Sequence, residues 1–192
     1  MPHVIVIAGA NGAGKSTVAP YLLRDTLGVS EFVNADTLAQ GLSAFSPETV
    51  AIKAGKIMLR RLDELAETNA DFAFETTLST RSFFPRLNRM RENGYKFKLV
   101  FLYLENSELA RLRVAERVRQ GGHDIPETTI KRRYEKGLRN FFALYKTIAD
   151  NWFFYNNSDT KNLKLIAKGN LSKTEEVFEP DIWKQLKENY EK

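Results

Sequence analysis

Apolar and polar positions along the chain alternate between strand-like and helix-like patterns. Uninterrupted apolar runs predict buried strands of the kind found in parallel sheets. We expect such strands at residues 3–8, 31–36, 71–78, 98–104 and 152–155, with a short edge strand at 163–168. Apolar residues spaced three and four positions apart predict helices at residues 15–27, 83–93, 107–120 and 127–150, and around Met58, Leu62, Leu65 and Ala66.

This order of elements predicts a three-layer α/β fold with a mainly parallel, five-stranded sheet. The chain has 192 residues, which is the size of one domain, so we expect residues 1–192 to fold as a unit. Its last part, residues 172–192, is charged and amphipathic and predicts a final helix.

The charge of the chain is concentrated in one region. Nine basic and four acidic residues lie between Leu109 and Asn140, so this window accounts for the whole net charge of +5 and should attract an anionic ligand. The chain has no cysteine, which suits a reducing cytosol. Its apolar runs are too short to cross a membrane, so we expect a cytoplasmic protein without a membrane partner.

The first predicted strand runs directly into a phosphate-binding motif. Residues 9–16 have the sequence GANGAGKS, which fits the pattern G-x-x-x-x-G-K-S/T between a strand and a helix. In this motif backbone N–H groups cradle phosphates, the lysine meets the terminal phosphates, and the serine hydroxyl ligates Mg²⁺. We therefore expect ATP or GTP with Mg²⁺, the latter on Ser16, bound by Gly9, Ala10, Asn11, Gly12, Ala13, Gly14, Lys15, Ser16 and Thr17.

Acidic and hydroxyl side chains follow two of the other predicted strands. In open α/β sheets ligands bind beyond the carboxyl ends of the strands, so Asp36, Glu75 and Thr77 should face the site of Lys15. Asp36 could deprotonate an acceptor hydroxyl, or it could be the N-cap of the next helix. Glu75 could hold Mg²⁺ through water, bind substrate hydroxyls, or pair with a nearby arginine. Asn156, Asn157 and Ser158, at another strand end, are candidates for contact with the base.

Arginines flank a glycine pair within the basic window. Arg113 and Arg117 are four residues apart and share a helix face, while Arg132 and Arg133 follow Gly121 and Gly122. Arginine matches phosphate oxygens and stabilises the charge of a transferred phosphoryl group. We interpret residues 107–140 as a mobile helical lid in which Arg113 and Arg117 bind the nucleotide, the alternative being a solvated basic face.

Together these motifs resemble the zeta-toxin family of phosphate-loop kinases, from the first strand to about residue 158. The matching segments are GANGAGKST, VNAD and FETTLS. The resemblance implies that Asp36 activates a sugar hydroxyl and that Glu75 and Thr77 contact the substrate. It also implies that two lid arginines meet the phosphates, and Arg117 fits the first of them. The best-studied members phosphorylate UDP-N-acetylglucosamine and are the toxins of toxin–antitoxin pairs, which implies an antitoxin partner.

The chain departs from the family pattern at two positions. The second lid arginine should lie shortly before the lid proline, where this chain has His123, so Arg132 or Arg133 would have to replace it. The arginine of the substrate strand, two residues beyond the threonine, falls on Ser79, with Arg81 nearby. Kinase chemistry therefore transfers to this chain more directly than the identity of the sugar.

The sequence thus favours an ATP-dependent phosphotransferase acting on a hydroxyl of a small molecule, such as a nucleotide sugar, with Lys15, Asp36 and Arg117 as catalytic residues. One alternative is a polynucleotide kinase or RNA-binding ATPase. Against it, Phe141, Phe142 and Tyr145 are spaced like the core face of a helix rather than as a stacking platform, so we expect no nucleic-acid partner. The other alternative is a non-catalytic, nucleotide-dependent switch protein.

Overall fold

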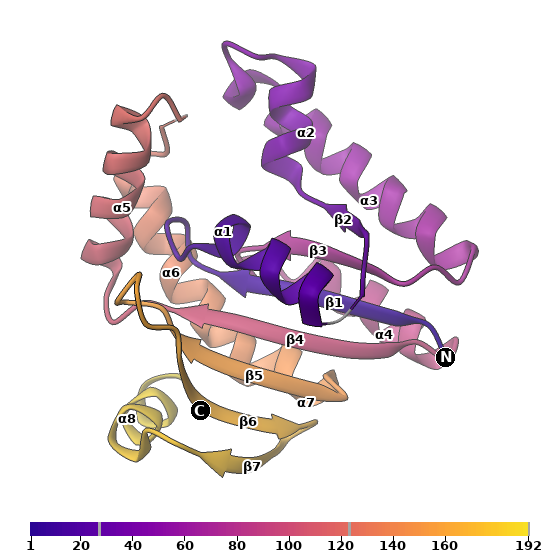
Figure 1. The fold of residues 1–192 in the computed structure, drawn as a ribbon, viewed down its shortest axis with the longest axis vertical. Helices are drawn as coiled ribbons and strands as arrows, with labels where there is room; N and C mark the ends of the chain where they lie inside the picture. Colours follow the sequence, from indigo (N-terminus) through magenta and orange to yellow (C-terminus); the bar gives the residue numbers. More distant parts are fainter. Residues whose placement is uncertain (27, 123, 192) are drawn as a thin grey trace.

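A twisted seven-stranded sheet forms the centre of the molecule (Figure 1). The computed structural model describes residues 1–26, 28–122 and 124–191. The strand order is β2-β3-β1-β4-β5-β6-β7. The strands are β1 (His3–Gly9), β2 (Glu31–Val33), β3 (Phe72–Thr76), β4 (Lys96–Tyr103), β5 (Asn151–Asn156), β6 (Lys164–Asn170) and β7 (Lys173–Val177).

The first five strands are parallel, as the apolar runs predict. β1 lies at the centre between β3 and β4, with Val6 in register with Phe74 on one side and Leu99 on the other. All three residues are almost fully buried. Since these strands are parallel, their carboxyl ends meet at one edge of the sheet, where the phosphate loop begins.

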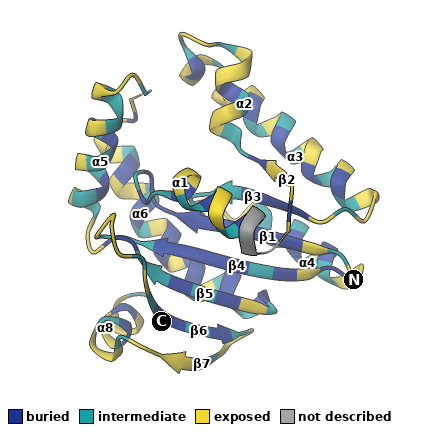
Figure 2. Ribbon diagram, in the orientation of Figure 1, coloured by how far each residue is buried: buried dark blue, intermediate teal, exposed yellow. Residues whose placement is uncertain are grey.

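The sheet has seven strands rather than the predicted five. β6 pairs with β5 and β7 pairs with β6, both antiparallel. β6 confirms the strand expected at residues 163–168, but it lies between β5 and β7 and not at the edge. The prediction of one helix over residues 172–192 is wrong for its first part, which forms β7. This strand, Lys-Thr-Glu-Glu-Val, lies at the exposed edge of the sheet (Figure 2). It therefore buries no apolar face that could have revealed it in the sequence.

Helices cover both faces of the sheet and complete three layers. α1 lies on one face, whereas α4 and α6 lie on the other (Figure 1). The helices are α1 (Lys15–Pro20), α2 (Ala35–Leu42), α3 (Ala51–Glu67), α4 (Phe83–Glu92), α5 (Ser107–Arg119), α6 (Glu127–Asn140), α7 (Lys146–Ile148) and α8 (Pro180–Tyr190). No helix in the described ranges has both the length and the apolar character that a membrane span requires.

Two of the predicted helices change their winding along their length. α1 ends at Pro20, and a π-helical turn (Tyr21–Thr26) continues it. Proline lacks the N–H that an α-helix needs, which accounts for a change near this residue. The predicted end of this helix, Leu27, lies outside the described residues. The predicted helix over residues 127–150 is α6, a π-helical segment (Phe141–Tyr145) and α7.

Aromatic side chains fill the core beneath the second half of the sheet. Phe141 packs against Phe101, Phe154 and Trp152, with ring centroids 4.9–5.9 Å apart. As predicted, Phe141, Phe142 and Tyr145 are core residues, and each is at most 2% exposed. α8 closes this core, because its Trp183 stacks on Trp152 at 5.5 Å. The last residue of the predicted terminal helix, Lys192, lies outside the described residues.

Candidate active site

The phosphate loop lies between β1 and α1 and is enclosed by α5 and the end of β5. Gly12 and Gly14 have φ angles of +78° and +82°, which disfavour residues with a side chain. A Cβ atom on Gly12 would lie 2.8 Å from the carbonyl oxygen of Ala110, and one on Gly14 would lie 2.6 Å from Nδ2 of Asn157. The loop therefore needs glycine for its backbone conformation and also for its close packing.

Lys15 lies at the floor of this loop. Its side chain is only 6% exposed, and its Nζ donates a hydrogen bond of 2.9 Å to the carbonyl oxygen of Ala10. The same Nζ lies 3.6 Å from Oε1 of Glu75, a residue at the carboxyl end of β3. These two contacts fix the ammonium group of the lysine that, in a loop of this type, reaches the terminal phosphates.

Glu75 connects the phosphate loop to β2. Its Oε2 accepts hydrogen bonds from the Ser16 hydroxyl at 2.7 Å and from Nδ2 of Asn34 at 2.9 Å. One of the expected roles of Glu75 was pairing with an arginine. The structure contradicts this role, because Glu75 forms its ion pair with Lys15. Its position beside Ser16 is compatible both with a role at the metal and with contact to substrate.

The residues around Ser16 suit Mg²⁺. The Ser16 hydroxyl and the Glu75 carboxylate are adjacent hard oxygen donors, and Mg²⁺ is usually held by one or two such groups together with substrate phosphates and water. In the described part of the chain, no group of three acidic, histidine or cysteine side chains could form a metal site made of protein alone. The donor set therefore fits a metal that arrives with the nucleotide.

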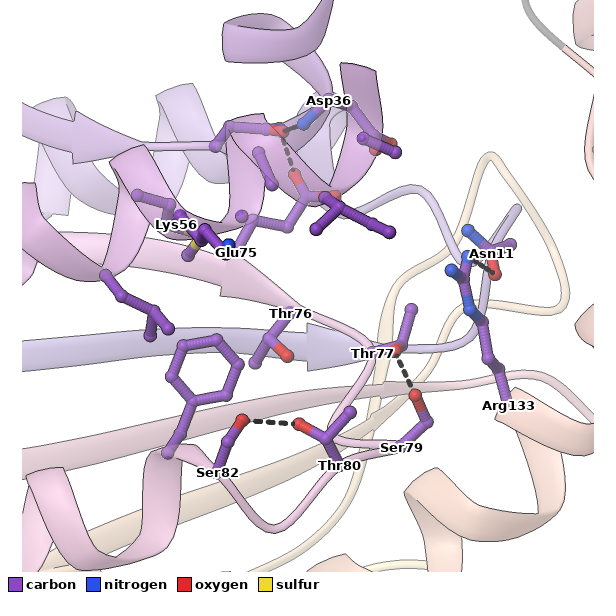
Figure 3. Close-up of a pocket in the computed structure, with 18 of the residues that line it drawn as sticks. Asn11, Asp36, Lys56, Glu75, Thr76, Thr77, Ser79, Thr80, Ser82 and Arg133 are labelled. Carbon is purple, nitrogen blue, oxygen red and sulfur yellow. Dashed lines mark hydrogen bonds between the residues drawn. The ribbon is translucent and has the colours of Figure 1, made fainter. Parts of the chain in front are cut away.

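Asp36 does not cap the helix that it begins. The N-cap of α2 is Asn34, whose Oδ1 accepts hydrogen bonds from the N–H groups of Asp36 (2.7 Å) and Thr37 (3.3 Å). The interpretation of Asp36 as an N-cap is therefore wrong. Its carboxylate is exposed, lies in the first turn of α2 and lines the pocket drawn in Figure 3. An N-cap signal was present in the segment Val-Asn-Ala-Asp, but it belonged to Asn34.

Two cavities meet at the residues just described. One, of about 450 Å³, lies between the phosphate loop, α5 and the loop after β5, and we call it the nucleotide cavity. The other, of about 460 Å³, lies between α3 and the loop after β3 (Figure 3), and we call it the acceptor cavity. Both are the size of small-molecule sites. Four residues line both of them: Asn11, Lys15, Asp36 and Glu75.

The predicted nucleotide-binding arginines of α5 lie in the nucleotide cavity. Arg113 and Arg117 both line it, together with Thr17, Asn157 and Thr160. The guanidinium of Arg113 donates to the carbonyl oxygens of Asn157 (2.8 Å) and Ser158 (2.6 Å), and its burial lowers its pKa. Arg113 thus holds the loop after β5 in place as one wall of the cavity.

Asn157 joins this loop to the phosphate loop. It is buried, and its Nδ2 donates a hydrogen bond of 2.8 Å to the carbonyl oxygen of Ala13. We expect Asn157→Ala to raise the KM for ATP several-fold with little change in kcat, because an unpaired buried carbonyl costs about 1–3 kcal/mol and loosens the cradle. Steady-state kinetics checks this. Asn162→Ala, at an exposed position of the same loop, is the control, and equal KM values would contradict the expectation.

The two candidates for the second lid arginine differ in position. Arg133 lines the acceptor cavity, is half-buried, and its Nη1 donates to Oδ1 of Asn11 at 3.2 Å. Burial lowers its pKa, whereas the charge of Asp36 acts in the opposite direction. Arg132 is exposed and lines neither cavity. His123, where the family pattern has its arginine, lies outside the described residues.

The loop after β3 contributes hydroxyl groups to the acceptor cavity, but its arginine does not line that cavity. Thr77 and Ser79 line the acceptor cavity, and their hydroxyl groups lie 2.9 Å apart. Arg81 is exposed and does not line it. The opposite wall, formed by α3, could not be recognised from the sequence, because its apolar residues give the same pattern as any amphipathic helix.

The chain matches the family model described as Zeta toxin over residues 1–165. The chain belongs to the zeta toxin family. This membership, together with the phosphate-loop kinase fold, supports an ATP-dependent kinase that binds a nucleotide.

Several relatives of this zeta toxin family member are known. An uncharacterised protein of Haemophilus influenzae is 29% identical over 130 residues, which cover 68% of this chain and 91% of that protein. The structure of the PezAT toxin–antitoxin system of Streptococcus pneumoniae matches 99% of this chain and 78% of that chain, with a TM-score of 0.68 and 19% identity. AvrRxo1-ORF1, solved with AvrRxo1-ORF2 and ATP, matches 97% of this chain and 63% of that chain, with a TM-score of 0.73 and 17% identity. These likenesses confirm the predicted fold class.

Proposed function

We propose that this protein transfers the γ-phosphate of ATP to a hydroxyl group of a small molecule, with a nucleotide sugar such as UDP-N-acetylglucosamine as the acceptor and GTP as the alternative donor. One observation supports this most directly. The nucleotide cavity and the acceptor cavity share Lys15, Asp36 and Glu75, so a donor in one and an acceptor in the other would meet at these side chains. A protein that only bound a nucleotide would not need the second cavity.

In the proposed reaction the acceptor oxygen attacks the γ-phosphorus. A new P–O bond forms, the bond to the β–γ bridging oxygen breaks, and ADP leaves. Asp36 takes the proton of the acceptor hydroxyl, and Lys15 stabilises the negative charge on the transferred group. Thr77 and Glu75 orient the acceptor. Mg²⁺, which Ser16 and Glu75 would hold, supplies positive charge to the phosphates when it is bound.

We further propose that residues 107–140 form a lid whose arginines bind the phosphates, within one kinase domain over residues 1–192. Arg117 lines the nucleotide cavity from α5, and Arg133 reaches the loop residue Asn11 from α6. The two side chains therefore approach the shared residues from both lid helices. Of the two candidates for the second arginine, the position of Arg133 supports it and that of Arg132 does not.

Arg117→Ala and Arg133→Ala should each slow phosphate transfer by roughly 10²-fold or more, since in-cis arginines contribute to charge stabilisation in phosphoryl transfer. Single-turnover rates with saturating ATP measure this. Arg132→Ala is the matched control, because it removes a neighbouring arginine that lines neither cavity. A rate for Arg133→Ala equal to that of Arg132→Ala would show that Arg133 has no part in transfer.

The basic window favours a nucleotide ligand over nucleic acid, because part of its charge is neutralised locally. Arg111 pairs with Glu108, and Arg119 pairs with Glu116 at 3.1 Å. These pairs leave fewer free cations for a phosphate backbone than the composition suggests. Polynucleotide kinase activity is thus the second candidate, supported only by the cations that point into the cavities.

Incubation with γ-labelled ATP and a panel of nucleotide sugars, nucleosides and short RNA tests the proposal. We expect the label on a nucleotide sugar. Label on RNA would establish the polynucleotide alternative, and tight ATP binding without transfer to any compound would indicate a switch protein. Family membership also supports an antitoxin partner, which co-purification from the native host would reveal.

A further inference from the structure

One face of α6 contacts both the phosphate loop and the loop after β3. Arg133, Gly137 and Asn140 are spaced four and three residues apart, so they lie on the same face of the helix. Nη1 of Arg133 donates to Oδ1 of Asn11 in the phosphate loop (Figure 3). Gly137 and Asn140 meet the loop after β3, and we call residues 77–82 the acceptor loop. A single helix face thus touches the loop proposed to hold the donor and the loop that lines the acceptor cavity.

Gly137 permits the close approach of α6 to the acceptor loop. Glycine in a helix interior is unfavourable, because it loses more backbone freedom on folding than other residues. Gly137 is buried, and a Cβ atom placed on it would lie 2.6 Å from the carbonyl oxygen of Thr77, too close for packing. Since Gly137 has no positive φ angle, this contact is what requires glycine here. A larger residue would displace the backbone of Thr77, which lines the acceptor cavity.

Two buried donors hold further carbonyl groups of the acceptor loop. Nδ2 of Asn140 donates to the carbonyl oxygen of Leu78 at 2.7 Å, and the hydroxyl of Tyr145 donates to that of Thr80 at 2.8 Å. Tyr145 belongs to the π-helical segment that continues α6, and both donors are at most 6% exposed. Such bonds are costly to lose, because the buried carbonyl group is left without a partner. Together with the contact at Gly137, they fix the loop at three of its carbonyl groups.

The acceptor loop needs this support at Leu78. The φ angle of Leu78 is +52°, in the left-handed region that residues with a side chain rarely adopt, and its side chain is fully buried. Such conformations persist only where the surrounding structure holds them. Leu78 lies between Thr77 and Ser79, whose hydroxyl groups lie 2.9 Å apart in the acceptor cavity. The backbone at Leu78 therefore sets the position of both hydroxyl groups.

We propose that α6 and the π-helical segment after it form a spacer that sets the distance between the phosphate loop and the acceptor loop, with Gly137, Asn140 and Tyr145 as positioning residues for phosphate transfer. The inference rests on the proposed function. The three residues line neither cavity, so they would act through Thr77 and Ser79 rather than by touching a ligand. A misplacement of about 1 Å near the reacting groups can slow a reaction roughly 10²-fold.

The variants Tyr145→Phe and Tyr134→Phe form a matched pair that tests the hydrogen bonds. Both tyrosines are buried, and each donates to a backbone carbonyl oxygen at 2.8 Å, Tyr134 to that of Leu104, which lies outside the acceptor loop. Each variant loses one hydroxyl group and keeps the packed ring. We expect Tyr145→Phe to lower kcat/KM for UDP-N-acetylglucosamine, or for the compound that the wild type labels, several-fold. The Kd for Mg·ATP should not change, and Tyr134→Phe should resemble the wild type.

A second pair of variants tests the close contact. Gly137→Ala should lower kcat/KM for the same acceptor by about tenfold or more, because the new methyl group displaces Thr77. The Kd for Mg·ATP should again stay within a few-fold of the wild type. Gly41→Ala is the control, since Gly41 is also helical but a Cβ atom there would meet no other atom within 4 Å. If thermal melting shows that Gly137→Ala is unfolded, the milder Tyr145→Phe variant decides.

Amide hydrogen exchange gives a measurement that does not depend on the acceptor. We expect Asn140→Ala to speed exchange in residues 77–82, because the carbonyl group of Leu78 loses its partner and the loop opens more often. Exchange in the phosphate loop, residues 9–16, should stay unchanged and serves as the internal reference.

The outcomes separate this inference from the proposed function. Equal kcat/KM values for Tyr145→Phe and Tyr134→Phe, and for Gly137→Ala and Gly41→Ala, would overturn the positioning role even though transfer takes place. A loss of affinity for Mg·ATP as large as the loss of transfer would overturn it as well, because the role would then be a general structural one. If the wild type labels no compound, the proposed function fails. Exchange in Asn140→Ala then decides whether α6 holds the acceptor loop: faster exchange supports the spacer, and unchanged exchange overturns it.

Discussion

Replacing Lys15 by alanine is expected to abolish phosphate transfer and to weaken nucleotide binding strongly. The ammonium group is buried, donates to the carbonyl oxygen of Ala10, and belongs to the lysine that meets the terminal phosphates in a loop of this pattern. Loss of a single preorganised donor of this kind typically costs about 10²–10³-fold in rate. Calorimetry with Mg·ATP and a transfer assay measure the two effects separately.

A second lysine provides the control for this variant. Lys53 is exposed on α3 and lines neither cavity, so Lys53→Ala should bind and turn over ATP like the wild type. Thermal melting must show that the Lys15→Ala protein is folded, because removal of the ammonium group leaves the Glu75 carboxylate without the ion pair that it forms with Lys15. Normal turnover by a folded Lys15→Ala protein would refute the assignment of the phosphate loop.

Asp36→Asn is expected to bind ATP normally and to transfer phosphate roughly 10²–10⁴-fold more slowly, the range typical of general base catalysis. Asparagine keeps the shape of the side chain but cannot accept the proton of the acceptor. The helix should not be affected, since Asn34 supplies the N-cap of α2. Binding by calorimetry and single-turnover transfer rates test both parts of this expectation.

Asp181 offers a matched control for Asp36. Both aspartates occupy the second position of a helix, Asp36 in α2 and Asp181 in α8, but Asp181 lines neither cavity. Any general effect of losing a negative charge in a first helical turn should therefore appear in Asp181→Asn as well. Transfer by Asp36→Asn within a few-fold of Asp181→Asn would exclude Asp36 as the base.

The parallel part of the sheet could be predicted because its strands are apolar throughout. A strand covered by helices on both faces has no polar side, so runs such as residues 3–8 and 98–104 are distinctive. β7 could not be predicted in this way. It pairs only with β6 at the edge of the sheet, and its sequence Lys-Thr-Glu-Glu-Val has the charge of a solvated helix face.

The phosphate loop and the strand ends were accessible from the sequence for a topological reason. Carboxyl ends of parallel strands converge, so Asp36 and Glu75 had to lie near Lys15 once the strands were recognised. The partners of these residues were less accessible. The choice between Arg132 and Arg133 depends on the direction in which α6 presents each side chain, and the contact of Asn157 with Ala13 spans 144 residues. The role of each of these residues remains a prediction.

The stacked pair Trp152 and Trp183 has a consequence for spectroscopy. These are the two tryptophans of the chain, both are buried, and neither lines the nucleotide or the acceptor cavity. Intrinsic tryptophan emission should therefore be almost silent when ligands are added, yet change sharply when α8 separates from the sheet. The chain thus contains a built-in optical probe of unfolding that is independent of the chemistry at the other end of the sheet.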